Sequence, residues 1–172
     1  MARGAMLSGP NGGKHMTETQ TYKGGCFCGA VQLEVQGQPA AAGICHCESC
    51  RKWHSAPVNA WAIWPDAMVK VAAGQDQLVE FNRQGADGPS ARVSCKRCGG
   101  AVFNRKPKIG MTVVYAMTLD GSGLVFEPSF HCFYGEGVLH IADGLPKFAD
   151  LPAALGGSGE RFDEPAGSGF RR

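Results

Sequence analysis

Eight cysteines carry most of the chemical information in this chain of 172 residues. They fall into four groups: Cys26-Phe27-Cys28, Cys45-His46-Cys47-Glu48-Ser49-Cys50, Cys95-Lys96-Arg97-Cys98, and Cys132 alone. Closely spaced cysteines on a tight turn can aim two sulfurs at one ion, and zinc prefers four soft ligands in a tetrahedron. The spacing therefore predicts that the cysteines bind metal, as two zinc ions, rather than form a disulfide framework.

Two of the groups form a pair of dithiols, Cys26-x-Cys28 and Cys95-x₂-Cys98, each followed by glycine. Glycine lets the backbone fold back after the second cysteine and aim N–H groups at the thiolates. We expect one closed, structural zinc site with these four ligands. The alternatives are disulfides or unpaired core thiols. Disulfides are typical of secreted proteins, and this chain shows no secretory leader. Cysteines separated by one or two residues also bridge each other only with strain.

The middle group supplies three thiolates, Cys45, Cys47 and Cys50, within six residues. Three protein ligands and one open position are typical of a catalytic zinc ion. The alternative is a second structural site, and the residues that could complete it are His46, His54, His131 and Cys132. The aromatic setting of Cys132 favours a small buried apolar side chain rather than a ligand.

Basic residues gather in residues 96–108, which contain no acidic residue. One interpretation is a solvated strand pair with its loop, and the other is a rim that receives the anionic groups of a substrate. The residues are Lys96, Arg97, Arg105, Lys106 and Lys108, while Arg51 and Lys52 adjoin the three-cysteine group. The formal net charge of the chain is only +2, which argues against a dedicated nucleic-acid binder.

Composition predicts one globular domain, with 44% hydrophobic and 19% charged residues. No apolar run approaches the about 18 residues of a membrane span, and no secretory leader is visible, so we expect a cytoplasmic protein with no membrane partner. We interpret residues 1–16 as an expression leader and residues 20–155 as the zinc-binding domain. Residues 156–172, rich in glycine, serine and charge, are predicted to be a flexible tail.

Short apolar runs separated by glycine, proline and aspartate predict an all-β fold of small sheets with minimal helix. Val31, Leu33 and Val35 alternate with polar residues, as in a half-buried strand. Single helical turns are expected near residues 48–53 and 146–151. Further strands are expected at residues 58–63, 68–71, 78–81, 91–95, 111–118 and 124–126.

The cysteine groups and their neighbours resemble the glutathione-dependent formaldehyde-activating enzyme family over about residues 22–150. The resemblance rests on Gly24–Val31, Cys45–Lys52 and Cys95–Gly99, with support from Ala60-Trp61, Pro65, His131 and Asp143-Gly144-Leu145-Pro146. It implies the all-β fold called a β-tent. It also implies a structural zinc ion on Cys26, Cys28, Cys95 and Cys98, and a catalytic one on Cys45, Cys47 and Cys50.

The activity that the resemblance implies is a carbon–sulfur lyase or synthase reaction, the condensation of glutathione with formaldehyde to S-hydroxymethylglutathione. A zinc ion held by three cysteinates has a formal charge of −1, which favours positioning of the substrate over strong Lewis acidity and makes nearby cations useful. Two alternatives stay open. One is an enzyme for another aldehyde or thiol, and the other is a two-zinc binding module for a protein or nucleic-acid partner.

Overall fold

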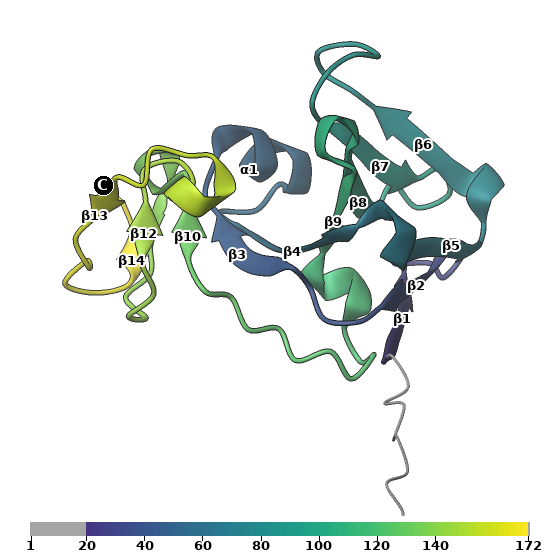
Figure 1. The fold of residues 1–172 in the computed structure, drawn as a ribbon, viewed down its shortest axis with the longest axis horizontal. Helices are drawn as coiled ribbons and strands as arrows, with labels where there is room; N and C mark the ends of the chain where they lie inside the picture. Colours follow the sequence, from purple (N-terminus) through teal and green to yellow (C-terminus); the bar gives the residue numbers. More distant parts are fainter. Residues whose placement is uncertain (1–19, 172) are drawn as a thin grey trace, which may run out of the picture.

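The computed structural model describes residues 20–171, so the leader expected at residues 1–16 lies outside the described residues. Strands dominate this part of the chain, which confirms the all-β prediction (Figure 1). A three-stranded antiparallel sheet has the order β1-β2-β5. Its strands are β1 (Thr21–Gly25), β2 (Gln32–Gln36) and β5 (Val69–Ala73).

The larger sheet has nine strands in the order β13-β12-β10-β3-β4-β9-β8-β7-β6. Its pairs are antiparallel except that β10 runs parallel to β3 and to β12. The strands are β3 (Ala41–Cys45), β4 (Asn59–Pro65), β6 (Leu78–Phe81), β7 (Ala91–Cys95), β8 (Ala101–Lys106), β9 (Met111–Tyr115), β10 (His131–Cys132), β12 (Lys147–Phe148) and β13 (Arg161–Phe162). A two-stranded ribbon joins β11 (Leu139–His140) to β14 (Gly169–Phe170).

Helical structure in residues 20–171 is limited to α1 (Glu48–His54) and short 3₁₀ turns. The 3₁₀ turns are η1 (Asp66–Met68), η2 (Gln75–Gln77), η3 (Pro107–Ile109), η4 (Ala116–Leu119), η5 (Tyr134–Glu136) and η6 (Ala153–Leu155). In this described part, no helix has the length and apolar character that a membrane span requires.

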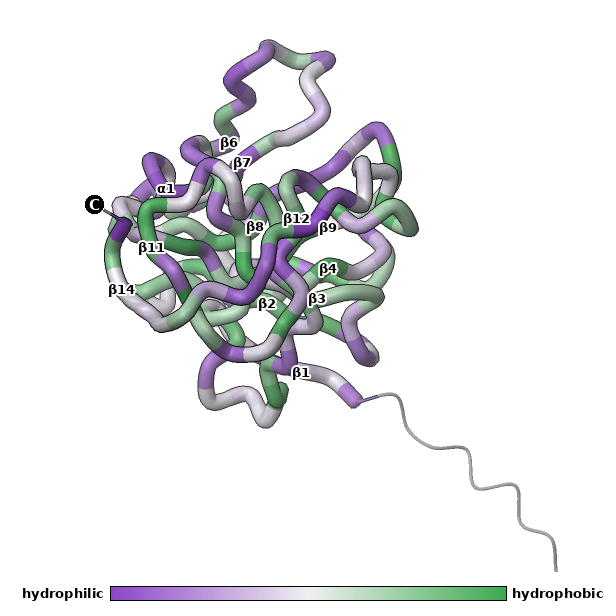
Figure 2. The backbone as a smooth tube through the Cα atoms, turned by 90° about the vertical axis from the view of Figure 1, so that its left-hand side faces the viewer, coloured by the Kyte–Doolittle hydropathy of each residue, from purple (hydrophilic) through white to green (hydrophobic). Residues whose placement is uncertain are grey.

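The large sheet has two different faces. Ala62 and Trp64 of β4 and Val114 of β9 pack with the three-stranded sheet in the main core, where Trp64 is fully buried. Trp61 of β4 directly precedes Ala62, and Val113 of β9 directly precedes Val114. Both belong to a second cluster on the opposite face. Successive side chains of a strand point to opposite faces, so two strands build both clusters. The loop between β6 and β7 projects from this body (Figure 2).

The sequence located six of the fourteen strands in the described part of the chain. The predicted strands near β2, β4, β5, β6, β7 and β9 are observed, as is the helical turn that becomes α1. Residues 124–126 form no strand, and residues 146–151 contain β12 instead of a helical turn. The sequence does not predict β1, β3 and β8, whose residues give no alternating apolar pattern, or the strands β10 to β14, which have only two residues each.

Residues 156–171, the described part of the segment expected to be a flexible tail, contain two short strands. Strand β13 pairs with β12, and β14 pairs with β11, at the end of the molecule shown in yellow in Figure 1. Between these strands the Glu164 carboxylate accepts from the Lys147 ammonium at 2.7 Å. The segment lacks the apolar residues to fold alone, and it gains order from strand pairing and ion pairs that composition does not encode. The domain bounds of 20–155 stay a prediction.

Gly24 provides a test of the close contact between β1 and η4. A Cβ atom at Gly24 would lie 1.9 Å from the backbone oxygen of Thr118, so Gly24→Ala must displace backbone. We expect the free energy of unfolding to fall by about 1–3 kcal/mol, the usual cost of overpacking. Urea unfolding measures it. Gly167→Ala is the control, because a Cβ there meets no atom within 4 Å, and equal stability of both variants would contradict the contact.

Candidate metal centres

Cys26, Cys28, Cys95 and Cys98 come together although 67 residues separate Cys28 from Cys95. Their four sulfurs lie within 4.8 Å of one another. Two of the separations are 3.7 Å (Cys26 to Cys28) and 4.0 Å (Cys28 to Cys95). Zinc–sulfur bonds of about 2.3 Å place tetrahedral ligands about 3.8 Å apart, so the cluster has the size of a zinc–sulfur tetrahedron.

Backbone N–H groups already favour thiolates at this cluster. The Val31 amide donates to the Cys26 sulfur at 3.2 Å. The Gly100 amide is the largest of the contacts that lower the pKa of Cys98 to about 6. Gly99 adopts a positive φ of 71°, the conformation that favours glycine and that turns the chain back after Cys98. The glycines that follow Cys98 thus act as the spacing predicts, whereas the Gly29 amide donates to the Cys26 carbonyl.

Cys45, Cys47 and Cys50 form the second group, and their sulfurs also lie within 4.8 Å of one another. Cys45 ends β3, and Cys47 caps α1 by accepting from the Cys50 amide at 3.2 Å. In the described part of the chain this group contains three sulfurs and no fourth donor. The neighbouring Cys132 and Cys47 thiols raise the pKa of Cys45, a crowding of sulfurs that a bound cation would relieve.

The three sulfurs lie in a cleft of about 480 Å³, within the range of small-molecule pockets. Its walls are largely apolar and include Trp61, Ile63, Val113 and Leu151. A second hollow of about 700 Å³ lies beside the four-cysteine cluster and shares Asn59 and Tyr115 with the cleft. Cys132 is buried and lines the cleft, where its thiol neighbours that of Cys45, and its role as an apolar side chain rather than a ligand stays a prediction.

The basic residues predicted as an anion-receiving rim separate into two sets. Lys106 and Lys108 line the cleft, and burial lowers the pKa of Lys106. Arg105 instead pairs with Glu80, and Lys96 donates to the Asp76 carbonyl. Arg97 does not line the cleft.

The two basic residues next to the three-cysteine group, Arg51 and Lys52, bond to other groups of the protein. Arg51 donates to the backbone oxygens of His46 and Glu136 at 3.1 and 3.0 Å. Lys52 forms an ion pair with Glu48 one turn away. Neither lines the cleft.

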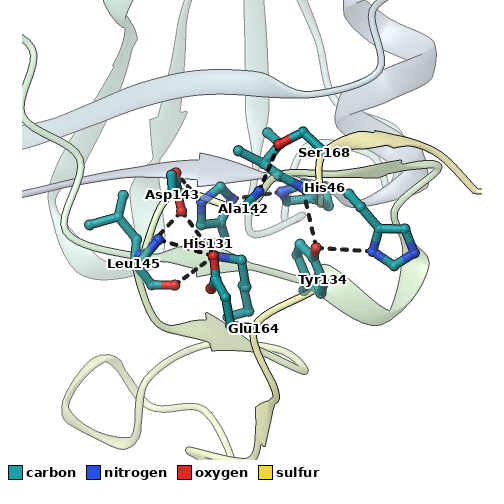
Figure 3. Close-up of polar contacts among 12 residues, drawn as sticks. His46, His131, Tyr134, Ala142, Asp143, Leu145, Glu164 and Ser168 are labelled. Carbon is teal, nitrogen blue, oxygen red and sulfur yellow. Dashed lines mark hydrogen bonds and ion pairs between the residues drawn. The ribbon is translucent and has the colours of Figure 1, made fainter. Parts of the chain in front are cut away.

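His46 and His131, two possible ligands, belong instead to a buried polar network behind the three-cysteine loop (Figure 3). His46 Nε2 lies 2.8 Å from His131 Nδ1, and His131 Nε2 lies 2.9 Å from Asp143. A carboxylate only accepts, so His131 donates to Asp143; a neutral His131 then accepts from His46. Burial lowers the pKa of His46 to about 4, so its ring is neutral at pH 7. His46 is therefore a support for the loop between Cys45 and Cys47.

Lys147 extends this network to the last residues of the chain. Its side chain is 1% exposed, and its ammonium group donates to Asp143, Glu164 and the Leu145 carbonyl at 2.9, 2.7 and 2.8 Å. Desolvation of Asp143 opposes ionisation, but Lys147 and His131 together lower the pKa of Asp143 to about 2. The carboxylate is thus charged at neutral pH and fixes His131.

A family model decides the relationship of this chain to known proteins. The model described as "Glutathione-dependent formaldehyde-activating enzyme" matches residues 21–136, which contain both cysteine clusters. The chain belongs to the glutathione-dependent formaldehyde-activating enzyme family.

Two further similarities are weaker. An uncharacterized lyase of Schizosaccharomyces pombe (strain 972 / ATCC 24843) is 28% identical over 82 residues, which are 48% of this chain and 56% of that protein. The chain therefore matches little more than half the length of this curated relative. A crystal structure of a Rhodobacter sphaeroides protein is 27% identical, with a TM-score of 0.45, and covers 58% of this chain and 88% of that one.

Sequence reasoning missed several residues of this family member's site. Arg92 and Tyr115 line the cleft together with the three sulfurs. Arg92 Nη2 donates to Ser49 at 3.0 Å and lies 3.9 Å from the Cys50 sulfur. Both residues are on strands that the sequence does predict, and the order of β7 and β9 in the sheet, which it does not give, brings them to the cleft. Asp143 was noted, but its link to Lys147 was not.

Replacing Lys147 tests the support behind the three-cysteine loop. Lys147→Met leaves the carboxylates of Asp143 and Glu164 without their shared partner. We expect the free energy of unfolding to fall by about 1.5–3 kcal/mol, the net contribution of a hydrogen bond to a charged group, because the buried Lys147 ammonium donates to Asp143. Thermal and urea unfolding measure it. The exposed Lys70→Met is the matched control, and a Lys147→Met protein as stable as this control would refute the network's role.

Proposed function

We propose that the chain is a zinc-dependent carbon–sulfur lyase or synthase that condenses glutathione with formaldehyde or a related aldehyde. One observation carries the proposal: three cysteine sulfurs meet in a cleft that Arg92, Lys106 and Lys108 also line. Family membership supplies the reaction class. The cations supply partners for the carboxylates of a thiol such as glutathione.

The donor sets fit zinc in number and chemistry. Cys26, Cys28, Cys95 and Cys98 would hold a structural ion, and Cys45, Cys47 and Cys50 would hold a catalytic one. Zinc, when bound, supplies stabilisation of a substrate thiolate at neutral pH, where a free thiol is mostly protonated. The apolar cleft walls exclude water, and Lys106 and Lys108 orient the anionic thiol next to the three sulfurs.

Cys50→Ser tests the three-cysteine centre. We expect zinc content to fall from two ions per chain to one, with the fold retained, because the four-cysteine site is intact. Elemental analysis measures the zinc. ¹³C exchange NMR with glutathione and ¹³C-formaldehyde measures the reaction above its spontaneous rate, and this acceleration should vanish in Cys50→Ser.

Cys132→Ala is the matched control for zinc content, since Cys132 lines the same cleft outside the three-sulfur group. It should retain two zinc ions. Loss of one ion would make Cys132 a ligand. Unchanged turnover in Cys50→Ser would refute the catalytic centre, and a wild type with two zinc ions but no acceleration would redirect the proposal to another aldehyde.

Lys106→Met tests the cationic wall. Lys106 lines the cleft and donates to Ser90 at 3.1 Å. Loss of a charge-assisted hydrogen bond costs about 1.5–3 kcal/mol, so KM for glutathione should rise at least about tenfold with little change in kcat. Steady-state kinetics measures both constants. Lys96→Met is the control from the same basic segment, since Lys96 bonds to Asp76 outside the cleft; equal effects in the two variants would contradict the assignment.

A further inference from the structure

One part of the cleft around the three-cysteine group is apolar, and the elements that supply it differ from those that supply the cations. In the large sheet, β12, β10, β3, β4 and β9 precede β8 and β7. Arg92 comes from β7, Lys106 from β8 and Lys108 from η3, the turn that follows β8. Six apolar residues come from β4, β9 and the segments after β10 and β12. We call them the apolar wall: Trp61, Ile63, Val113, Phe133, Leu151 and Leu155.

The apolar wall directly adjoins the sulfur centre. Cys45 belongs to a buried hydrophobic cluster, and Cys47 and Cys50 pack against this cluster. All wall residues except Leu155 also belong to the cluster or pack against it. A hydrocarbon chain attached to a carbon atom beside the sulfurs would therefore extend along apolar side chains.

Phe133 supports a functional role for the wall, because its backbone has an unfavourable conformation. Its φ is 53° and its ψ is 38°, in the left-handed region that glycine adopts freely and that costs other residues free energy. The Phe133 amide donates to the Asp150 carbonyl at 2.9 Å, which joins the segment after β10 to the segment of Leu151. Strained residues concentrate at ligand sites, so an aromatic side chain held here beside the sulfurs points to a ligand contact.

Glutathione and formaldehyde leave this wall without a partner. Formaldehyde has no chain, while the cleft of about 480 Å³ has the size of pockets for larger ligands. Glutathione is polar along its length, with carboxylate, amide and ammonium groups, and its carboxylates have partners in the cations of the cleft. An apolar surface beside the reaction centre is instead complementary to a hydrocarbon group.

We propose that the cleft binds thiol adducts of aldehydes that carry an apolar chain, with the anionic part of the thiol against the cations and the chain against the apolar wall. This inference rests on the proposed function and names the class of aldehyde. In the condensation the thiol sulfur forms a bond to the carbonyl carbon, and the π electron pair of the carbonyl group moves onto oxygen. The thiol proton ends on that oxygen, which gives a hydroxyl group without oxidation or reduction.

The family match does not cover the whole wall. Leu151 and Leu155 lie beyond residue 136, where the match ends. Selectivity for the chain of the aldehyde thus depends in part on residues outside the matched domain.

S-alkyl glutathiones are the probes for a binding experiment. Each is a thioether that resembles the adduct, and it has no thiol that could react with the cysteines or compete for zinc. Isothermal titration calorimetry of the zinc-loaded full chain compares S-hexylglutathione with S-methylglutathione, which differ only in the length of the alkyl chain. Burial of one methylene group strengthens binding about fourfold. We expect the Kd of the hexyl probe to be at least about tenfold lower than that of the methyl probe.

Phe133→Gly and Leu155→Ala each remove part of the wall. Glycine adopts the backbone conformation of Phe133 without strain, and Leu155 is 44% exposed, so both variants should fold, which circular dichroism verifies. We expect the preference for the hexyl probe to fall at least about fourfold in each variant, the effect of one buried methylene group, with zinc content unchanged. Met117→Ala is the matched control, because Met117 is exposed and lines the second hollow instead. It should retain the wild-type preference.

Equal Kd values of the two probes in the wild type overturn the inference, as does a preference that both wall variants retain. Kinetics separates the inference from the proposed function. NMR measures the condensation of glutathione with formaldehyde and with hexanal above the spontaneous rates, and we expect a higher kcat/KM for hexanal. Preference for the hexyl probe without acceleration for either aldehyde would retain the apolar wall and refute the proposed function. Acceleration for formaldehyde with equal affinities of the two probes would do the reverse.

Discussion

Strands β4 and β9 lie side by side in the large sheet, and both of their faces are occupied (Figure 1). Trp64 and Val114 fill the main core under the three-stranded sheet, while Trp61 and Val113 form a wall of the cleft. A shift of one residue in their register would exchange the two sets. The same pairing that stabilises the core therefore fixes the wall of the cleft. It also sets the position of Tyr115, the last residue of β9.

The three-cysteine loop depends on support from residues far away in the sequence. Cys45 lies opposite Cys132 in the parallel pairing of β3 with β10. His46 does not line the cleft, and its ring is linked through His131 to Asp143, which pairs with Lys147 (Figure 3). The segment that completes this network lies beyond residue 136, where the family match ends. Preorganisation of the sulfurs thus involves parts of the chain that carry no cysteine ligand.

The sequence predicts what depends on local spacing. Cysteines two or three positions apart indicate both sulfur clusters, with glycine after each dithiol of the first, and alternation in Val31, Leu33 and Val35 indicates β2. It does not predict contacts that depend on strand order. Arg92 and Tyr115 are separated by β8 in the sheet and still line one cleft, and no pattern along the chain marks this. The folding of the last residues of the chain also depends on contacts between distant segments, since the Glu164 carboxylate pairs with Lys147, which is buried in β12.

The charges of the cleft's basic residues and of the three-cysteine group are complementary. A zinc ion with three cysteinates would carry a formal charge of −1, which would repel an anionic thiol such as glutathione. Arg92 beside Cys50, with Lys106 and Lys108 on the walls, offsets this charge over a short distance in a cleft that is largely apolar. Under the proposed function, the same cations would stabilise the sulfur centre and attract the anionic substrate.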